Sequence, residues 1–413
     1  MKKLMSCAVM LMLAPAAGAY GAQTAGLPGA YLDFVGGPRL SGMGRAYVGL
    51  AEGADAVSWN PGGLGFLRPN VVGFMHTQTE EQARLDYVGY AQPIYRWGAL
   101  GLAYTRLDSG ALPQTDEFNR TVGQFRDLQQ AFMAGYGLAV HPRLSLGGTF
   151  KFAQQSLSGA SAKGWGMDLG ALAKLQDHYQ AGVRVRNLIS PRLSYDSGVD
   201  SFSRVVTLGL AGKWLQERLA VTADVERGAD SSGDVNWRLG AEGTLWRVVK
   251  LRAGFDFAMK EFSVGVGYQW GRSSVGAAIG SNQYGFAQKV GMDYAFGGYD
   301  LILSAAPEVF SPMGLTKRTI FAIKLNHSTP IDAWVFEIRN QHNDVVYKVM
   351  GSGRPPTELT WDGRTSYGMV VAPGAYGATL NVTDKNGRTE ITPVQTVRVQ
   401  YGTPLDELEI SVR

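Results

Sequence analysis

Apolar and polar residues alternate along most of the chain, in segments of about ten residues separated by turn residues. The segment 249–257 places Val, Leu, Ala and two Phe at its odd positions and Lys, Arg, Gly and Asp at its even ones. Successive side chains of a β-strand point to opposite faces, so each segment predicts a strand with one apolar and one polar face. Fourteen such strands are expected, near 69–79, 83–93, 96–107, 128–140, 143–154, 163–175, 178–187, 203–214, 218–227, 234–245, 248–257, 260–270, 272–281 and 284–296.

The two faces differ in a way that is typical of membrane barrels. The polar face is rich in Gly, Lys, Arg, Asp and Glu, whereas the apolar face often ends in Trp, Tyr or Phe. This pattern fits a lipid-facing exterior around a polar lumen, and an even strand number fits a single-chain bacterial barrel. A large soluble all-β protein is the alternative, but it would need to cover this apolar surface. We therefore expect an all-β chain with an antiparallel transmembrane β-barrel of about 14 strands over 69–297, with its longest loops near 108–127 and 188–202.

Composition supports a barrel and argues against a nucleic-acid partner. Only 18% of the residues are charged, 45% are hydrophobic, and the mean hydropathy of −0.08 is near zero. Glycine accounts for 54 of the 413 residues, often inside the expected strands, where it suits tight curvature. The net charge is +4 and the basic residues form no run, so binding to nucleic acid has little support.

The N-terminus has the pattern of a secretory signal peptide. Lys2 and Lys3 precede the apolar stretch 4–13, and Ala17-Gly18-Ala19 is a cleavage motif, so we expect a signal over 1–19 cut between 19 and 22. Cys7 is the only cysteine and leaves with the signal, unless it marks a lipoprotein, which its short preceding segment disfavours. No stretch of 18 apolar residues follows, so no transmembrane helix is expected.

The composition changes after Gly297-Gly298 to fewer glycines and more Pro, Asn and Thr. Turn signals there separate short strands, expected at 319–325, 333–340, 345–350, 357–361, 374–383 and 389–399. About 100 residues with six or seven such strands suggest an Ig-like β-sandwich, which we place at 305–413, with Trp334 and Trp361 in its core.

A glycine-rich signature precedes the first expected strand. Residues 36–64 include Gly42-Met43-Gly44, Asp55 and Asn60-Pro61-Gly62-Gly63-Leu64. This segment resembles the N-terminal signature of the PorV/PorQ family, which is similar in fold to FadL-type barrels. Gly62 departs from the Ala that is usual there. The resemblance implies that 23–68 folds into the barrel mouth as a hatch, either as a plain plug or as a ligand gate.

A second resemblance covers the last 80 to 100 residues. Trp361-Asp362-Gly363-Arg364, Gly374-Ala375-Tyr376 and Asp384-Lys385-Asn386-Gly387 resemble the FlgD Ig-like domain family. Such domains are accessory modules, so the resemblance implies contacts with other proteins and no catalysis.

The last expected barrel strand is open to two interpretations. Gly291-Met292-Asp293-Tyr294-Ala295-Phe296 resembles the terminal strand signal read by the outer-membrane assembly machinery, although here another domain follows it. The alternative is an ordinary strand with aromatic ends.

Enzymatic motifs are absent from the sequence. The five histidines are scattered, and no metal, nucleotide or nucleophile motif occurs, so we expect no enzyme, no metal site and no cofactor. Charges on the polar faces are instead expected to fill the lumen and to pair across neighbouring strands. The lumen-facing set is Arg184, Arg186, Arg238, Glu242, Lys250, Arg252 and Asp256, with Asp224, Glu226, Lys289 and Asp293 as further members.

Three functions fit these expectations. The PorV/PorQ resemblance implies a bacterial outer-membrane protein that acts in protein export or cargo handling, because that family includes a type IX secretion subunit. Its partners would be outer-membrane lipid and envelope or secretion proteins, with the Ig-like domain in the periplasm. The alternatives are a FadL-like transporter of hydrophobic small molecules, which a mostly charged lumen disfavours, and a structural protein with a periplasmic anchoring domain.

Overall fold

The computed structural model describes residues 27–401, apart from 80–82, 95–96, 177, 197, 216, 229–234, 247, 272, 283–284, 297–299, 327–329 and 386–388. The expected signal peptide with Cys7, the Gly297-Gly298 linker and the Asn386-Gly387 turn lie outside the described residues. In the described part, no helix has the length and apolar character needed to cross a membrane.

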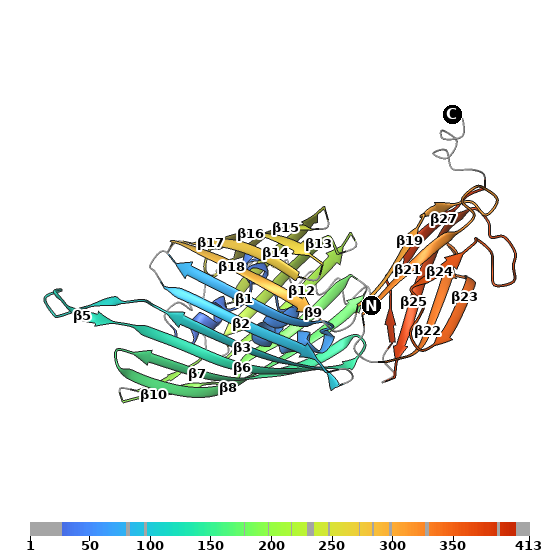
Figure 1. Cartoon of the computed structure of the whole chain (residues 1–413). Helices are drawn as coiled ribbons and strands as arrows, with labels where there is room; N and C mark the ends of the chain where they lie inside the picture. Colours follow the sequence, from blue (N-terminus) through green and yellow to red (C-terminus); the bar gives the residue numbers. More distant parts are fainter. Residues whose placement is uncertain are drawn as a thin grey trace. The chain divides into compact units, whose positions relative to one another are not determined.

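Fourteen antiparallel strands form a closed barrel, as the alternation predicts (Figure 1). The first strand pairs with the last to close it, beginning at Asn70 opposite Phe296. Most strand bounds lie within three residues of the expected ones. They are β1 Asn70–Thr79, β2 Arg84–Pro93, β3 Ala99–Asp108, β6 Asp127–His141, β7 Leu144–Leu157, β8 Ala160–Gln176, β9 Tyr179–Ile189, β12 Val205–Trp214, β13 Leu219–Gly228, β14 Val235–Leu245, β15 Val249–Asp256, β16 Glu261–Trp270, β17 Ser273–Asn282 and β18 Gly285–Phe296.

The outer face of the barrel is apolar and the inner face is not. In β16, Phe262, Val264 and Val266 are about half exposed on the outside, whereas Ser263 between them is only 1% exposed. The same parity holds in β12, where Leu208 is 54% exposed and Thr207 is fully buried. An exterior of this kind is the surface that a transmembrane barrel presents to lipid.

The two ends of the barrel differ. The end at which β1 begins and β18 ends is called the terminal end, and the opposite end is called the hairpin end. Both segments expected as long loops reach the hairpin end, and each folds into a two-stranded sheet instead of an irregular loop. One hairpin is β4 Leu112–Thr115 with β5 Thr121–Phe125, and the other is β10 Arg192–Tyr195 with β11 Gly198–Ser201.

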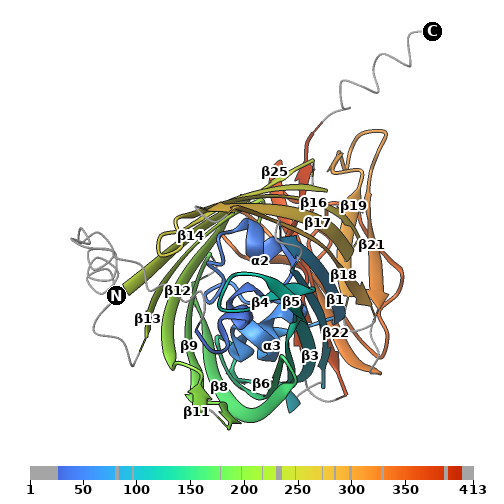
Figure 2. The same ribbon diagram turned by 90° about the vertical axis from the view of Figure 1, so that its left-hand side faces the viewer.

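Residues 27–69 fill the inside of the barrel and are called the plug (Figure 2). The plug contains only short helices, and two of them begin at a proline, the residue that suits the first helical position. They are η1 Ala30–Phe34, α2 Pro38–Gly42, η2 Gly53–Asp55, α3 Ala56–Trp59 and η3 Pro61–Phe66. Its apolar side chains belong to one buried cluster with residues of the wall.

The second compact unit begins at Gly297. One sheet has the order β19-β21-β24, and the other the order β20-β27-β25-β22-β23, with β26 beside β25. Phe310, Phe321, Phe336 and Trp361 are almost fully buried between them. The bounds are β19 Asp300–Ala306, β20 Val309–Phe310, β21 Thr319–Asn326, β22 Ile331–Arg339, β23 Val345–Ser352, β24 Glu358–Trp361, β25 Gly374–Asp384, β26 Thr389–Ile391 and β27 Gln395–Val399.

Two details of this unit differ from the sequence-based expectation. Strand β19 starts at Asp300, before the expected domain start at 305, and pairs with β21 over its whole length. The single strand expected over 389–399 is divided into β26 and β27 around Pro393. Proline has no backbone N–H to donate to a ladder, which accounts for the break.

Candidate functional site

The Gly-Met-Gly part of the hatch signature lies against the wall of the barrel. Met43 is fully buried. A Cβ on Gly44 would lie 2.5 Å from the backbone nitrogen of Phe255, and the φ of Gly44 is +61°. A Cβ on Gly42 would lie 3.1 Å from the Cα of Gly265. Glycine is therefore required at 44 both for its backbone conformation and for the contact with β15.

The Asn60-Pro61 turn joins two parts of the plug to the barrel. Asn60 is fully buried, and its Nδ2 donates to the carbonyl oxygen of Val48 at 2.8 Å and to that of Ala171 in β8 at 3.1 Å. Its Oδ1 accepts a hydrogen bond from the amide of Gly62 at 3.1 Å, which caps η3. Pro61 follows as the first residue of that helix, where its missing N–H costs nothing.

Asp55 is a buried carboxyl group of the plug. Its two oxygens accept hydrogen bonds from the Gly37 amide at 3.1 and 3.0 Å. A Cβ on Gly37 would lie 3.1 Å from Oδ2 of Asp55 and 3.9 Å from Oδ2 of Asp293, so two carboxyl groups face the same point. Burial, reinforced by the charge of Asp293, raises the pKa of Asp55 to about 7, against the opposing effects of the Gly37 hydrogen bond and Arg39.

Ion pairs attach the plug to the barrel wall. Nη2 of Arg39 lies 2.9 Å from Oε1 of Glu242, and Nη2 of Arg45 lies 3.0 Å from Oδ2 of Asp256. Asp33 of the plug accepts a hydrogen bond from Arg186 of β9. These partners are almost fully buried except for Arg39, so loss of one member of a pair leaves an uncompensated buried charge.

Asp224 of β13 adds a different kind of attachment. Its Oδ2 accepts hydrogen bonds from the backbone amides of Tyr47 at 2.8 Å and Val48 at 2.9 Å. A carboxylate that accepts from two successive amides fixes the backbone of the plug at that point.

The seven charges assigned to the lumen from sequence lie in β9, β14 and β15. The structure brings six of them into two groups and pairs the seventh, Arg186, with the plug. Arg238 contacts Glu226 at 2.9 Å and Asp256 at 2.8 Å, and Arg184 contacts the same Glu226 at 3.3 Å. Glu242 is 2.7 Å from Arg252 and 3.9 Å from Lys250. Arg186 contacts the plug residue Asp33. Sequence alternation indicates the inward faces but gives no signal for the plug partners Asp33, Arg39 and Arg45.

The other half of the lumen, formed by β1–β3 and β6–β8, carries fewer charges than expected, although Lys151 of β7 and Asp168 of β8 form a buried ion pair of 2.7 Å there. Met75, Leu85, Tyr87 and Met133 are at most 5% exposed and join the buried cluster of the plug. The sequence-based expectation drew its charged residues mainly from the second half of the barrel, where they are concentrated.

The ladder between β8 and β9 contains a bulge near the hairpin end. Ile189 lies four positions after Val185 in β9, whereas their partners Met167 and Leu169 in β8 are only two positions apart. Asn187, inside this bulge, has φ +56°, and its amide donates to Oδ1 of Asp168 at 2.6 Å. Bulges bend a strand and end its pairing. Strand β9 accordingly stops at Ile189, whereas β8 continues to the hairpin end.

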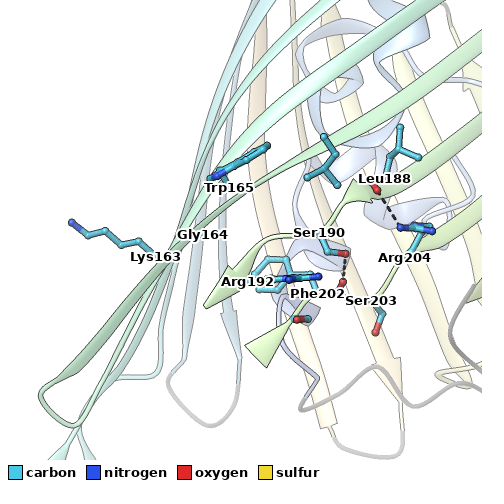
Figure 3. Close-up of a pocket in the computed structure, with 11 residues that line it drawn as sticks. Lys163, Gly164, Trp165, Leu188, Ser190, Arg192, Phe202, Ser203 and Arg204 are labelled. Carbon is cyan, nitrogen blue, oxygen red and sulfur yellow. Dashed lines mark hydrogen bonds between the residues drawn. The ribbon is translucent and has the colours of Figure 1, made fainter. Parts of the chain in front are cut away.

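A cavity of about 740 Å³ lies beside this bulge and is called the notch (Figure 3). Trp165 of β8, Leu188 and Ile189 of β9 form its apolar flank and are all exposed. Arg192 and Arg204 line it from the two ends of the β10–β11 hairpin. Nη2 of Arg204 donates to the carbonyl oxygen of Leu188 at 3.3 Å, as the dashed line shows.

The floor of the notch is joined to the plug. Phe202 is buried, and its carbonyl oxygen accepts a hydrogen bond of 2.7 Å from Oγ of Ser190. Its ring lies against Gly29, near the first described residue of the plug. The floor of the notch is therefore in contact with the start of the plug.

The Ig-like motif residues are structural. Trp361 is 1% exposed, and its Nε1 donates to the carbonyl oxygen of Arg364 at 2.8 Å across Asp362-Gly363. Gly363 has φ +73°. Tyr376 packs edge-on against Trp361, with ring centroids 5.4 Å apart, and Gly374 begins its strand. Among the described residues, no group of three His, Cys, Asp or Glu side chains is placed to hold a metal ion.

Comparison with protein families finds a match for the C-terminal domain. Residues 311–388 match the model of the FlgD Ig-like domain. None of the curated proteins matches the chain. The matches do not include the PorV/PorQ family, so that resemblance stays a hypothesis.

Solved structures similar to this chain have low sequence identity to it. The Pseudomonas putida toluene transporter TodX is 15% identical, with a TM-score of 0.46 over 62% of this chain and 96% of that one. The CymD monoaromatic hydrocarbon channel is 13% identical, with a TM-score of 0.46 over 63% and 97%. A Pseudomonas aeruginosa FadL homologue is 11% identical, with a TM-score of 0.43 over 63% and 96%. At these scores the likenesses carry no argument about function.

Proposed function

We propose that this chain is a bacterial outer-membrane transporter that passes a hydrophobic small molecule between its bore and the surrounding bilayer. The observation that carries the proposal is the notch, a cavity beside the end of the β8–β9 ladder that has an exposed apolar flank and a floor in contact with the plug. A molecule that leaves a barrel sideways can enter lipid without crossing water.

The less charged half of the lumen supports this route. A hydrophobic molecule that follows β1–β3 and β6–β8 meets Met, Leu, Tyr and Ala side chains and one buried ion pair, Lys151 with Asp168, and avoids the larger charged groups of β9 and β13–β15. Desolvation of charges, which would oppose its passage, is thereby limited. The plug closes the route, and its first segment lies at the notch floor, so movement of that segment is the opening step.

Protein export of the PorV/PorQ type is the second candidate. It is favoured by the extent to which Arg39, Arg45 and Asp224 attach the plug to the wall, since a docking protein needs a rigid barrel and no passage. The Ig-like domain would then contact a cargo or a component of a type IX secretion apparatus. A purely structural protein anchored by that domain is the remaining possibility.

Uptake of an apolar dye by whole cells separates these functions. Cells that express the chain should take up N-phenyl-1-naphthylamine at a saturable rate. Ile189→Trp fills the notch and should lower this rate at least threefold, whereas Phe202→Ala should raise it by removing the floor. Val221→Trp is the matched control, because Val221 is an outward residue of β13, 41% exposed and remote from the notch.

The compared variants must be present in the outer membrane in equal amounts and must show equal heat-modifiability on gels, so that differences in uptake do not reflect expression or folding. Equal dye uptake with and without the chain would contradict transport. Under that outcome, a partner that co-purifies with the full chain but not after deletion of 305–413 would favour the export function.

A further inference from the structure

The notch combines three features that a plain lateral opening does not require. It is lined by two guanidinium groups, by three exposed apolar side chains, and by hydroxyl groups of Ser190, Ser201 and Ser203. No Asp or Glu is among the described residues that line it. A hydrocarbon would gain nothing from the two arginines.

The apolar flank faces lipid. Trp165 stacks on Phe150 of β7, with ring centroids 6.1 Å apart, and both side chains are more than half exposed on the outer face. Leu169 of β8 and Val183 of β9 are also exposed and continue this face away from the notch. An occupant can therefore place an apolar tail among the bilayer chains while its head lies in the notch.

The position of the arginines suits a headgroup. Tryptophan in membrane proteins concentrates at the level of the lipid headgroups, and Trp165 lies beside the notch near the hairpin end of the barrel. Arginine at this level binds phosphate oxygens through its planar fork of donors. Arg192 and Arg204 come from the two ends of one hairpin and line the same cavity, so a phosphate group placed in it meets two guanidinium groups. Lys163 stands on the outer rim, and its side chain points away from the cavity.

We infer that the notch is a binding site for the phosphorylated headgroup of a membrane lipid. The headgroup phosphate engages Arg192 and Arg204, and an acyl chain lies along Trp165, Leu188 and Ile189. The inference concerns the resting occupant of the notch and does not require that anything is transported through it.

Binding of tail-labelled lipids to the purified full chain in detergent tests this site. Phosphatidic acid with a fluorescent acyl chain should bind saturably, as measured by fluorescence anisotropy. The uncharged diacylglycerol with the same tail should bind at least tenfold more weakly. The double variant Arg192→Gln/Arg204→Gln should weaken phosphatidic acid binding at least tenfold.

Arg227→Gln is the control for loss of a guanidinium group outside the notch, because Arg227 is exposed, lies at the hairpin end of the barrel near the end of β13 and is not part of the notch. It should change the affinity less than twofold, and heat-modifiability should confirm that all variants are folded. Trp165→Ala should weaken binding of both lipids by similar factors, since it removes apolar contact only.

Three results would overturn the inference. Phosphatidic acid could bind the double variant as tightly as the wild type, millimolar inorganic phosphate could displace it completely, or oleate could bind more tightly than phosphatidic acid. The second result would assign the site to a free anion and the third to a carboxylate. If the chain takes up the dye but binds phosphatidic acid and diacylglycerol equally, the lipid site is refuted and the transport function stands. If it prefers phosphatidic acid but takes up no dye, the lipid site stands and the transport function is refuted.

Discussion

The ring of Phe202 occupies the space that a side chain at Gly29 would need. A Cβ on Gly29 would lie 2.5 Å from Cδ2 of Phe202, and Gly29 has φ +78°. One contact thus joins the entry of the plug to the floor of the notch, although the two residues are far apart in the sequence. A change in the position of Gly29 would therefore act directly on Phe202 at the floor of the notch.

Gly29→Ala should therefore loosen the entry of the plug. The substitution combines a positive φ, which costs about 1 kcal/mol for a non-glycine residue, with a steric conflict against Phe202. We expect a lower temperature for loss of the heat-modifiable form and faster proteolysis of the plug. Gly159→Ala is the control, because Gly159 has φ +90° but nothing within 4 Å of its Cβ position. Equal effects of the two substitutions would show that the Phe202 contact is unimportant.

A charge on the lipid face should disrupt assembly. Val266 lies in the middle of β16 and is 50% exposed on the outer face, so Val266→Arg should cost about 2–4 kcal/mol near the bilayer midplane. Gln269 is on the opposite face of the same strand, and Gln269→Arg should be tolerated. Heat-modifiability and the amount of folded protein in outer membranes measure both. Similar folding of the two variants would contradict the assignment of the outer face.

The strand pattern could be predicted from the sequence because alternation is local. Phe262, Val264 and Val266 have the same parity, and a one-residue shift of register would turn all of them inward. The contacts of the plug could not be predicted, because Arg39 and Glu242 are 203 positions apart and no periodicity relates them. The notch depends on a bulge at Asn187, whose positive φ has no clear sequence signal. The lower charge of the lumen along β1–β3 and β6–β8 was missed because the expectation was drawn from the inward faces of β9, β13–β15 and β18, where the charged residues are concentrated.

Acidic pH should stabilise the plugged barrel through Asp55. An aspartate has an ordinary pKa of about 3.9, and burial beside Asp293 raises that of Asp55 to about 7. Between these values the folded state keeps a proton that the unfolded state has released, so stability falls as the pH rises from about 4 to 7. The melting temperature should be higher at pH 5 than at pH 8, and Asp55→Asn should reduce this difference. The exposed Asp200→Asn is the control and should leave the difference unchanged.

The Ig-like domain should lie in the periplasm. A closed barrel of fourteen strands has both chain ends at its terminal end, and short turns of bacterial barrels face the periplasm. A protease added to intact cells should leave residues 305–413 uncut, and permeabilisation of the outer membrane should allow cleavage. A tag displayed in a β4–β5 loop should be accessible in the same intact cells. Cleavage of the domain without permeabilisation would reverse the orientation.

Loss of Glu242 should weaken the attachment of the plug more than loss of any single exposed charge. Glu242 contacts Arg39 of the plug and Arg252 of the wall, so Glu242→Gln removes the carboxylate that these two guanidinium groups share and leaves Arg39 paired only with Glu52 of the plug itself. Breaking a buried ion pair costs about 3–5 kcal/mol, and here part of that cost falls on the bond between plug and wall.

In planar bilayers the wild type should conduct little, the variant should show brief openings, and deletion of 27–68 should give a steadily open pore. Asp116→Asn, in the exposed turn between β4 and β5, is the control for loss of a carboxylate and should conduct like the wild type. If Glu242→Gln stays closed while the deletion is open, the remaining contacts at Asp256, Asp224 and Asn60 hold the plug without Arg39, and opening must begin at the Gly29 end.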